Sequence, residues 1–462
     1  MTRWIKIVFK TFFVLVFVLG YSNCTNKKES NSSSKKTGKI GDEGNVTVTI
    51  CALRDHSFEV ALDLLKNSDF EQRTGICVNA VLLEFDPMVR AHELNFNSKK
   101  SSYDLVSIDQ PSLGHYVTNG WVKNLNEYIN DNTLPSLNLD DVVPVLKTAC
   151  GEWGNGFYAI PLGSYGALLA YRADILTTAG LNPPKTFEEF KLISKKLTNS
   201  PEIYGTALFA HLGEYITADI APFLWSWGAG LINGCDVDLS NMPKYRAAWS
   251  TPEGIAALEF YASLYREKLT HPLTLDFDHE RYINAFQSGK VVMGIMPAEG
   301  IGKPMEDVEK SKVIGKMAYT TLPGKKLKDG SIASSQPGLG AHSLAISNYS
   351  EHPKEAYLVM QFLTGKMIGE EYMKKGGRPF RLSHFSDKAI SATPHLKAMR
   401  DGMKTGRCRP SIPEYPAVSH IFYTAFHSAL KHNAPISDVM KAAAQKANEE
   451  VLIPAYQVKN EK

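Results

Sequence analysis

Short runs of β-branched and apolar residues alternate with amphipathic stretches along residues 45–190 of this chain. The runs VTVTIC, VNAVLL and YDLVSI predict three strands. A stretch from Ser57 to Gly75, with Ser57 as its cap, and a second stretch over residues 87–97 predict the intervening helices. Strands that alternate with helices in this way form a parallel sheet, whose binding loops follow the carboxyl ends of the strands. The sequence therefore predicts an α/β fold.

The later part of the chain is richer in helical patterns. Thr251 and Pro252 provide a cap and a first-turn proline for a helix with an apolar stripe. VVMGIM and AHSLAI predict further strands, HPKEAYLVMQFLTG predicts a helix, and the tail is helical to about residue 453. The chain after residue 44, here called the body, is longer than a domain with a single hydrophobic core usually is, so we expect two domains.

The amino-terminal segment has the pattern of an export signal. Three basic residues precede TFFVLVFVLG, an apolar run shorter than the roughly 20 residues of a spanning helix, so residues 1–23 are predicted to be a signal peptide. Cys24 follows at the position of the lipid-attachment cysteine of bacterial lipoproteins, although Tyr21 and Asn23 depart from that motif. An ordinary signal peptide with an incidental cysteine is the alternative. Residues 24–44 are almost free of large apolar side chains and are predicted to be a flexible tether.

Charge and cysteine content narrow the function classes. The first 44 residues carry a net charge of +5, and the body carries −2, which argues against nucleic-acid binding although the whole chain carries +3. The sequence contains no C-x-x-C pair and no compact Cys/His cluster, so a metal site is not expected. Cys51 and Cys77 belong to adjacent predicted strands, at opposite ends, and are expected to be free thiols.

Six blocks, in their order and spacing, resemble the extracellular solute-binding proteins, family 1, of ABC importers. These blocks are FEQRTGICV, YDLVSIDQPSLGHYVTNGWVKNL, YAIPLGSYGALLAYRADILTTAGLNPPKTFEEF, FQSGKVVMGI, GLGAHSLAIS and KKGGRPFRLSHFSD. Within that family, APFLWSWGAGLING and the IPEYP turn are similar to binders of polyols or monosaccharides.

The resemblance implies a two-lobed periplasmic-binding-protein fold of type II, with discontinuous lobes joined by a hinge. The chain would cross between lobes near residues 160–165, 338–345 and 380–386. The amino-terminal lobe would comprise residues 45–161 and 342–382, and the carboxyl-terminal lobe residues 163–340 and 384–455.

The resemblance also implies a function: a monomeric, extracytoplasmic receptor that closes on a sugar or sugar alcohol and delivers it to a membrane permease. No cofactor and no catalytic residue are implied. A lipid on Cys24 would hold the protein at a bacterial cell membrane, and the tether would let the body reach its transporter. The alternative ligands within the same fold are non-sugar solutes such as a glycerol phosphate or a polyamine.

A polyhydroxylated ligand needs charged or amide groups for its hydroxyls and aromatic rings for its C–H faces. The predicted loops and crossings offer such groups. The candidates are Asp55, His56, Asp109, Gln110, Tyr165, Trp225, Trp227, Glu299 and Arg378.

Each candidate also has an alternative interpretation. Asp109 could be a turn or cap residue, Glu299 could be solvated, and Arg378 could pair with a surface acid. The stretch DHS at His56 also fits a helix start. Trp225 and Trp227 would face one side in a strand and diverge in a helix.

Two other function classes remain at this point. An anchored hydrolase or lyase would need a pair of carboxylates about 5–9 Å apart, and one sequence cannot exclude such a pair. However, the chain lacks the G-x-S-x-G, H-E-x-x-H and P-loop motifs. An adhesion lipoprotein would share the export signal without needing a cleft.

Overall fold

The computed structural model describes residues 46–100, 102–233, 245–393 and 395–455. The predicted signal peptide, the tether with Cys24, and Cys235 lie outside the described residues.

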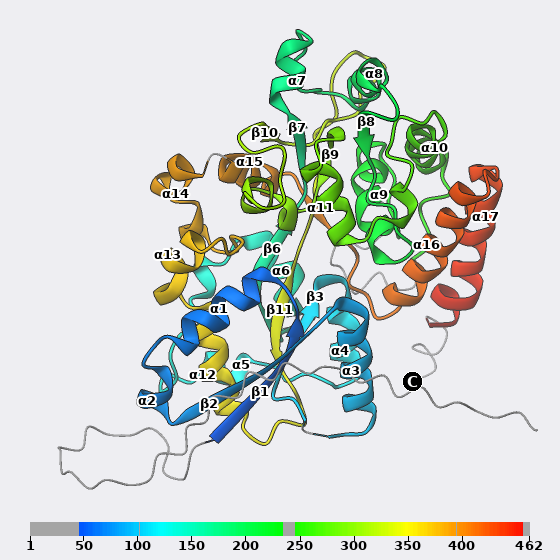
Figure 1. Cartoon of the computed structure of the whole chain (residues 1–462). Helices are drawn as coiled ribbons and strands as arrows, with labels where there is room; N and C mark the ends of the chain where they lie inside the picture. The colour runs from blue at the N-terminus through cyan, green and yellow to red at the C-terminus, as the bar shows by residue number, and fades with distance from the viewer. Residues whose placement is uncertain (1–45, 101, 234–244, 394, 456–462) are drawn as a thin grey trace, which may run out of the picture.

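Each of the two lobes is built around a mixed β-sheet (Figure 1). The first sheet runs in the order β12-β11-β3-β1-β2, and β6 also pairs with β11; its strands are β1 (Val46–Leu53), β2 (Ile76–Leu83), β3 (Leu105–Asp109), β6 (Ala159–Gly166), β11 (Gly338–Ile346) and β12 (Arg407–Cys408). The second sheet runs β10-β7-β9-β8; its strands are β7 (Leu168–Arg172), β8 (Tyr204–Ala207), β9 (Val291–Met296) and β10 (Met317–Thr320). A short ribbon joins β4 (Glu152–Trp153) to β5 (Gly156–Phe157).

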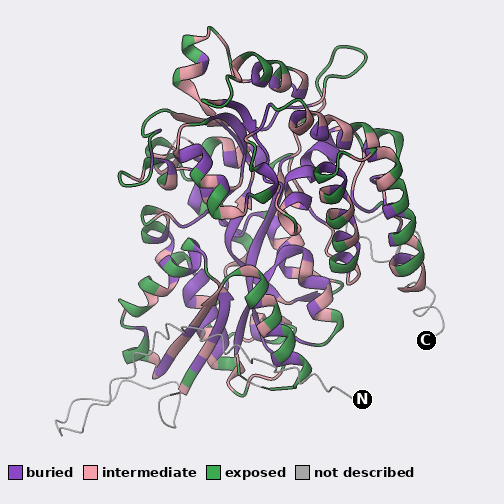
Figure 2. Ribbon diagram, turned by 45° about the vertical axis from the view of Figure 1, so that its right-hand side comes forward, coloured by how far each residue is buried: buried purple, intermediate pink, exposed green. Residues whose placement is uncertain are grey.

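Helices cover both sheets. Those of the first lobe are α1 (His56–Lys66), α2 (Phe70–Thr74), α3 (Phe85–Asn97), α4 (Leu113–Thr118), α5 (Asn126–Ile129), α6 (Pro144–Gly151), α12 (Pro353–Thr364) and α13 (Lys366–Lys374). Those associated with the second are α7 (Ala173–Thr178), α8 (Phe187–Leu197), α9 (Glu214–Ser226), α10 (Pro252–Arg266), α11 (His279–Gln287), α14 (Asp387–Ala392), α15 (His395–Met403), α16 (Tyr415–Lys431) and α17 (Ile436–Ala447). Figure 2 shows that the buried residues follow the sheets and the inner faces of these helices.

The predicted α/β fold class is confirmed, and so are the main predicted elements. Strands β1, β2 and β3 are parallel, as the alternating pattern predicts. Helix α10 starts at Pro252, and the Thr251 side chain accepts a hydrogen bond from the Gly254 N–H. Cys51 and Cys77 are buried thiols, and the strand register places them at opposite ends of the β1–β2 pair.

The predicted cap of the first helix is wrong. Both the cap and the start of α1 lie two residues earlier than predicted: the helix begins at His56, and the Asp55 side chain accepts the Ser57 N–H at 2.8 Å. Aspartate and serine are both good N-caps, and the two stand only two positions apart, so the pattern alone did not separate them. The stretch is also divided into α1 and α2 rather than forming one helix.

Two long strands, β6 and β11, run from the first lobe toward the second (Figure 1). They pair with each other, and β11 also pairs with β3. β7, in the second sheet, begins at Leu168, directly after β6 ends at Gly166. Among the described residues, no helix combines the length and apolarity that a membrane span requires.

Arg381 is a fully buried cation in the first lobe. Its guanidinium donates to three backbone carbonyls, those of Thr364 at 2.7 Å, Asn138 at 2.9 Å and Leu137 at 2.9 Å. Asp141 lies 3.7 Å from it and balances its charge. The side chain therefore holds the segment after α13 against the loop before α6.

We expect Arg381→Met to lower the free energy of unfolding by about 3–5 kcal/mol, because it leaves three buried carbonyls without their donor and removes a cation beside Asp141. Urea unfolding of the purified body measures this. Arg73→Met is the matched control, since the Arg73 side chain is 52% exposed, and it should change the free energy by less than about 0.5 kcal/mol. Equal effects of the two substitutions would contradict the structural role of Arg381.

Candidate functional site

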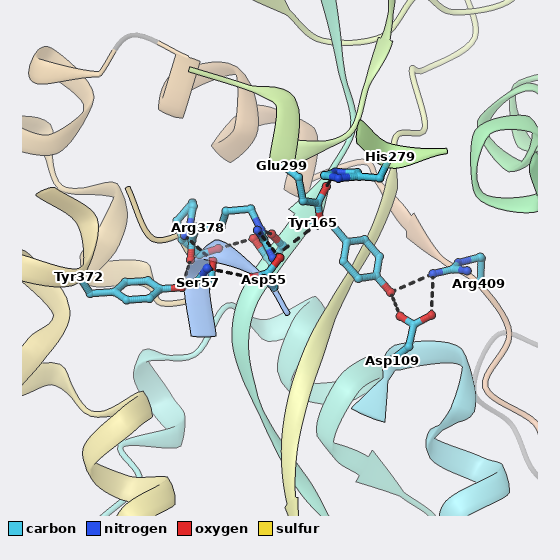
Figure 3. Close-up of polar contacts among 11 residues, drawn as sticks. Asp55, Ser57, Asp109, Tyr165, His279, Glu299, Tyr372, Arg378 and Arg409 are labelled. Carbon is cyan, nitrogen blue, oxygen red and sulfur yellow. Dashed lines mark hydrogen bonds and ion pairs between the residues drawn. The ribbon is translucent and has the colours of Figure 1, made fainter. Parts of the chain in front are cut away.

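Two clusters of charged and aromatic side chains lie where the lobes meet (Figure 3). The first, here called the Arg378 cluster, contains Asp55, Arg378 and Glu299. The second, called the Asp109 cluster, contains Asp109, Tyr165, Arg409 and Glu214.

The Arg378 cluster joins three distant parts of the chain. The Arg378 guanidinium lies 2.8 Å from the Asp55 carboxylate, after β1, and 3.7 Å from the Glu299 carboxylate, after β9. Its Nε donates to the Ser164 carbonyl on β6 at 2.8 Å. His279 approaches Glu299 from the other side at 3.9 Å. A buried arginine thus holds the loop after β1 and the loop after β9 together.

Gly163 makes the room that this arrangement needs. It adopts a φ of +88°, and a Cβ there would stand 2.7 Å from Ser57 and 3.3 Å from Arg378 Nη2. An L side chain there would therefore be strained, would collide with Ser57 and would crowd Arg378.

The charge state of Asp55 follows from its partners. Burial alone would raise the pKa of Asp55, but the charge and hydrogen bond of Arg378, together with smaller effects of His342 and the Ser57 N–H, outweigh burial and hold the pKa below its usual value. Asp55 is therefore a carboxylate at neutral pH and the counter-ion of Arg378.

The Asp109 cluster is centred on Arg409. Tyr165 donates its hydroxyl hydrogen to one oxygen of Asp109, and the Arg409 guanidinium lies 3.4 Å from the other. Arg409 also donates to the Tyr165 hydroxyl at 2.9 Å and pairs with Glu214 at 2.5 Å. Arg409 therefore links β3 of the first sheet to the first residue of α9.

The surroundings of Arg409 fix its position. Gln110 donates to the Arg409 carbonyl at 2.9 Å, and Glu214 accepts hydrogen bonds from Tyr415 and Ser419 on α16. Gly340 on β11 leaves space for the Tyr165 ring, since a Cβ there would stand 2.3 Å from that ring.

His342 lies between the two clusters, on β11. It stands opposite Asp109 in the β3–β11 ladder, and its ring packs against Tyr165 and Phe85 with centroids 6.2 Å away in each case. Burial lowers the pKa of His342, although Asp109 and Asp55 act in the opposite direction. The ring is therefore neutral at physiological pH.

The structure brings most of the predicted site residues to this region. Asp55, Glu299 and Arg378 meet in one cluster, and Asp109 and Tyr165 in the other, with Gln110 beside it. His56 is exposed nearby, and its ring contacts the Lys375 carbonyl at 3.0 Å.

The two tryptophans do not belong to this group. Trp225 is 6% exposed within the core of the second lobe, and Trp227 packs against Phe187 and Phe260 with centroids 5.3 and 5.1 Å away. They diverge because α9 is a helix that ends between them.

Sequence reasoning missed Arg409, Glu214 and His342. Arg409 stands just before the IPEYP turn and Glu214 just before a helical stretch, where charged residues are common. His342 lies inside a predicted strand. No local signal distinguishes them, because their contacts are made with residues far away in the chain.

The arrangement suits the recognition of a neutral, polar small molecule. Carboxylates, guanidiniums and a tyrosine hydroxyl offer directional acceptors and donors, and the Tyr165 and His342 rings offer flat faces. In the described part of the chain, no group of three or more His, Cys, Asp and Glu side chains is placed to hold a metal ion.

Known proteins are similar to this chain in sequence and in fold. A family model described as bacterial extracellular solute-binding protein matches residues 57–369. A probable ABC transporter-binding protein of Deinococcus radiodurans is 25% identical over 382 residues, which cover 79% of this chain and 84% of the relative.

Two solved structures of ABC transporter solute-binding proteins are also similar. One, from Agrobacterium radiobacter in complex with ribitol, has a TM-score of 0.77 and 26% identity, covering 87% of this chain and 98% of that one. The other, from Agrobacterium vitis with bound D-mannitol, has a TM-score of 0.72 and 21% identity, covering 87% and 98%.

We expect Arg378→Met to lower the free energy of unfolding at pH 7.5 by about 3–5 kcal/mol, because Asp55 is left as a buried charge without a counter-ion. The double variant Asp55→Asn/Arg378→Met should lose clearly less, since asparagine can still cap α1 and carries no charge. Urea unfolding of the wild type and both variants measures the difference.

The pH dependence of the stability difference between the wild type and Arg378→Met is the control. The stability that Asp55 adds in the wild type is present above the ordinary aspartate pKa and is lost as pH falls through its lowered folded pKa. In Arg378→Met, burial without the arginine raises the pKa of Asp55, so Asp55 is protonated and uncharged as the pH falls. The loss of stability relative to the wild type should therefore be smaller at pH 5 than at pH 7.5. A deficit that is the same at both pH values, or equal in the single and double variants, would count against the ion pair.

Proposed function

The chain belongs to the bacterial extracellular solute-binding protein family, and on that premise we propose that it binds a sugar or sugar alcohol between its lobes and delivers it to an ABC permease. Members of this family are binding proteins of ABC transporters and act outside the cytoplasm, without enzymatic activity. The observation that carries the proposal is the Asp109 cluster, in which a carboxylate, a tyrosine and an arginine from both lobes meet in a buried site.

The ligand class is supported by chemistry and by similarity. Hydroxyl pairs of a polyol can replace the contacts that Asp109, Tyr165 and Arg409 make with one another, because each of these groups offers directional hydrogen bonds. The Agrobacterium radiobacter relative, at 26% identity, is a ribitol complex. We assign the ligand contacts to the two clusters, with His56 and Gln110 at their edges and the two tryptophans as core residues.

The lobe boundaries remain part of the proposal: residues 45–161 with 342–382, and residues 163–340 with 384–455. The membership of β6 and β11 in the first sheet, with β7 in the second, supports crossings beside these strands. Closure about these crossings would bury the ligand from both sides, and the protein would act as a monomer. The free energy of closure must come from contacts made only in the closed form.

A calorimetric titration panel tests the proposal. Ribitol, D-mannitol, glucose and maltose represent the proposed class, and sn-glycerol 3-phosphate and putrescine represent the alternatives. We expect a sugar or sugar alcohol to bind with a dissociation constant near micromolar, which corresponds to about −8 kcal/mol. If only sn-glycerol 3-phosphate or putrescine binds, the ligand is not a sugar or sugar alcohol and the proposed ligand class is wrong. Chemical conversion of an added sugar by the protein would contradict the binding role.

We expect Asp109→Ala to weaken ligand binding about ten- to a hundredfold, because a hydrogen bond to a charged group contributes roughly 1.5–3 kcal/mol. Titration with the ligand found in the panel measures this. Asp104 is the matched control: it accepts the Thr49 N–H at 2.8 Å and the Ser350 hydroxyl at 2.6 Å, so it serves the fold. Asp104→Ala should lower the melting temperature and leave affinity unchanged, and the reverse pattern would contradict the assignment.

The anchor is also a proposal. We expect that Cys24 carries a lipid in the mature protein, so that Cys24→Ser moves the protein from the membrane fraction to the soluble fraction of cells that express it. Cys77→Ser is the control, because Cys77 is buried in β2 and should not affect fractionation. Metabolic labelling with a fatty acid that persists in Cys24→Ser would disprove the attachment point.

A further inference from the structure

Asp219, on α9, is a buried carboxylate that belongs to neither of the two clusters; it is 5% exposed. Within the described part of the chain no cation pairs with it. Its Oδ2 atom instead accepts two hydrogen bonds, from the Phe209 N–H at 3.0 Å and from the Tyr261 hydroxyl at 2.7 Å. Burial raises the pKa of Asp219 to about 6, although these two hydrogen bonds act in the opposite direction. The ionised group therefore lowers the stability of the fold at neutral pH, which points to a role beyond stability.

The Phe209 N–H belongs to the loop after β8, which leads into the ligand site. Residues 208–213 connect the end of β8 to Glu214, the first residue of α9 and a partner of Arg409. The loop is also held at Leu208, because the buried Thr274 hydroxyl accepts the Leu208 N–H at 2.9 Å and donates to its carbonyl at 2.8 Å. Two consecutive residues of the loop are thus fixed by buried side chains.

The start of α9 has no side-chain cap. Gly213 occupies the N-cap position with a φ of +139°, and no side chain accepts a hydrogen bond from the first turn there. Glycine tolerates this conformation but does not restrict the backbone to it. The position of Glu214 is therefore set by the loop before it and by its hydrogen bonds from Tyr415 and Ser419 on α16.

The Phe209 ring lies between the two parts of the second lobe that reach the site. Its centroid is 4.9 Å from that of Tyr215, the residue after Glu214, and 6.3 Å from that of His279. His279 in turn approaches Glu299 at 3.9 Å (Figure 3). The hydrogen bond to the Phe209 backbone therefore fixes a ring that contacts neighbours of both carboxylates supplied by the second lobe.

We propose that Asp219 is a positioning residue for ligand binding: through the loop after β8, it sets where the second lobe presents Glu214 and Glu299 to the first lobe. Asp219 itself does not touch the ligand. A loosened loop would leave both lobes folded but would shift hydrogen-bonding groups away from the ligand. This role rests on the proposed function, because it concerns the same site between the lobes.

Calorimetric titration at pH 7.5 tests this role with whichever of ribitol, D-mannitol, glucose and maltose binds the wild type most tightly. We expect Asp219→Leu, which removes the acceptor at a similar side-chain volume, to weaken binding about tenfold. Thr274→Val, which releases Leu208 in the same loop, should also weaken binding. Asp219→Asn keeps an oxygen that can accept the Phe209 N–H, so its affinity should stay within about threefold of the wild type.

Thr186→Ala is the matched control for stability. Thr186 caps α8 by accepting the Glu189 N–H at 3.1 Å, so it stabilises that helix rather than the loop after β8. Its substitution should lower the melting temperature and leave affinity unchanged. Thermal melts verify that each variant is folded at the titration temperature, and if Asp219→Leu is not, Thr274→Val decides, since it releases the same loop.

Three results would overturn the positioning role: wild-type affinity in the folded loop variants, equal weakening in Asp219→Leu and Asp219→Asn, or the same loss of affinity in Thr186→Ala. A failure of the proposed function looks different. If none of the four compounds binds the wild type, the proposed function is wrong and the positioning role falls with it. If the wild type binds and the loop variants bind equally well, only the positioning role is wrong.

Discussion

Two arginine side chains, Arg378 and Arg409, are buried where the lobes meet, and each is 6–7% exposed. A buried guanidinium needs carboxylates and carbonyls around it, since an unpaired charge in this environment costs several kcal/mol. The partners come from different lobes: Asp55 and Glu299 for Arg378, Asp109 and Glu214 for Arg409. Charge balance therefore couples the relative position of the lobes to the geometry of the site.

The same constraint explains the composition of the crossing strands. Gly163 on β6 and Gly340 on β11 stand where a side chain would collide with Ser57, beside Arg378, or with the Tyr165 ring. His342 remains between the clusters as a neutral ring, which adds no further charge to balance. The side chains that hold the lobes together are also those that a polyol could bind. Ligand binding and contact between the lobes therefore use the same hydrogen-bonding groups.

The sequence predicted the fold well because its strands and helices have clear periodicity. Asp55 and Asp109 were identifiable since Asp55 directly follows β1 and Asp109 ends β3, two strands with a recognisable pattern. Arg409 and Glu214 were not, because they meet across 195 residues and neither has a distinctive local pattern. The roles of Trp225 and Trp227 depended on whether their segment is a helix or a strand, and apolar runs of this kind do not distinguish the two.

The central claim is that a ligand binds to the polar groups of the two clusters, adds contacts to both lobes, and so stabilises the closed arrangement. Small-angle X-ray scattering of the purified body, with and without the sugar or sugar alcohol identified by calorimetry, tests this most directly. The account predicts a smaller radius of gyration at saturation. An unchanged radius in a sample that calorimetry shows to be saturated would contradict it.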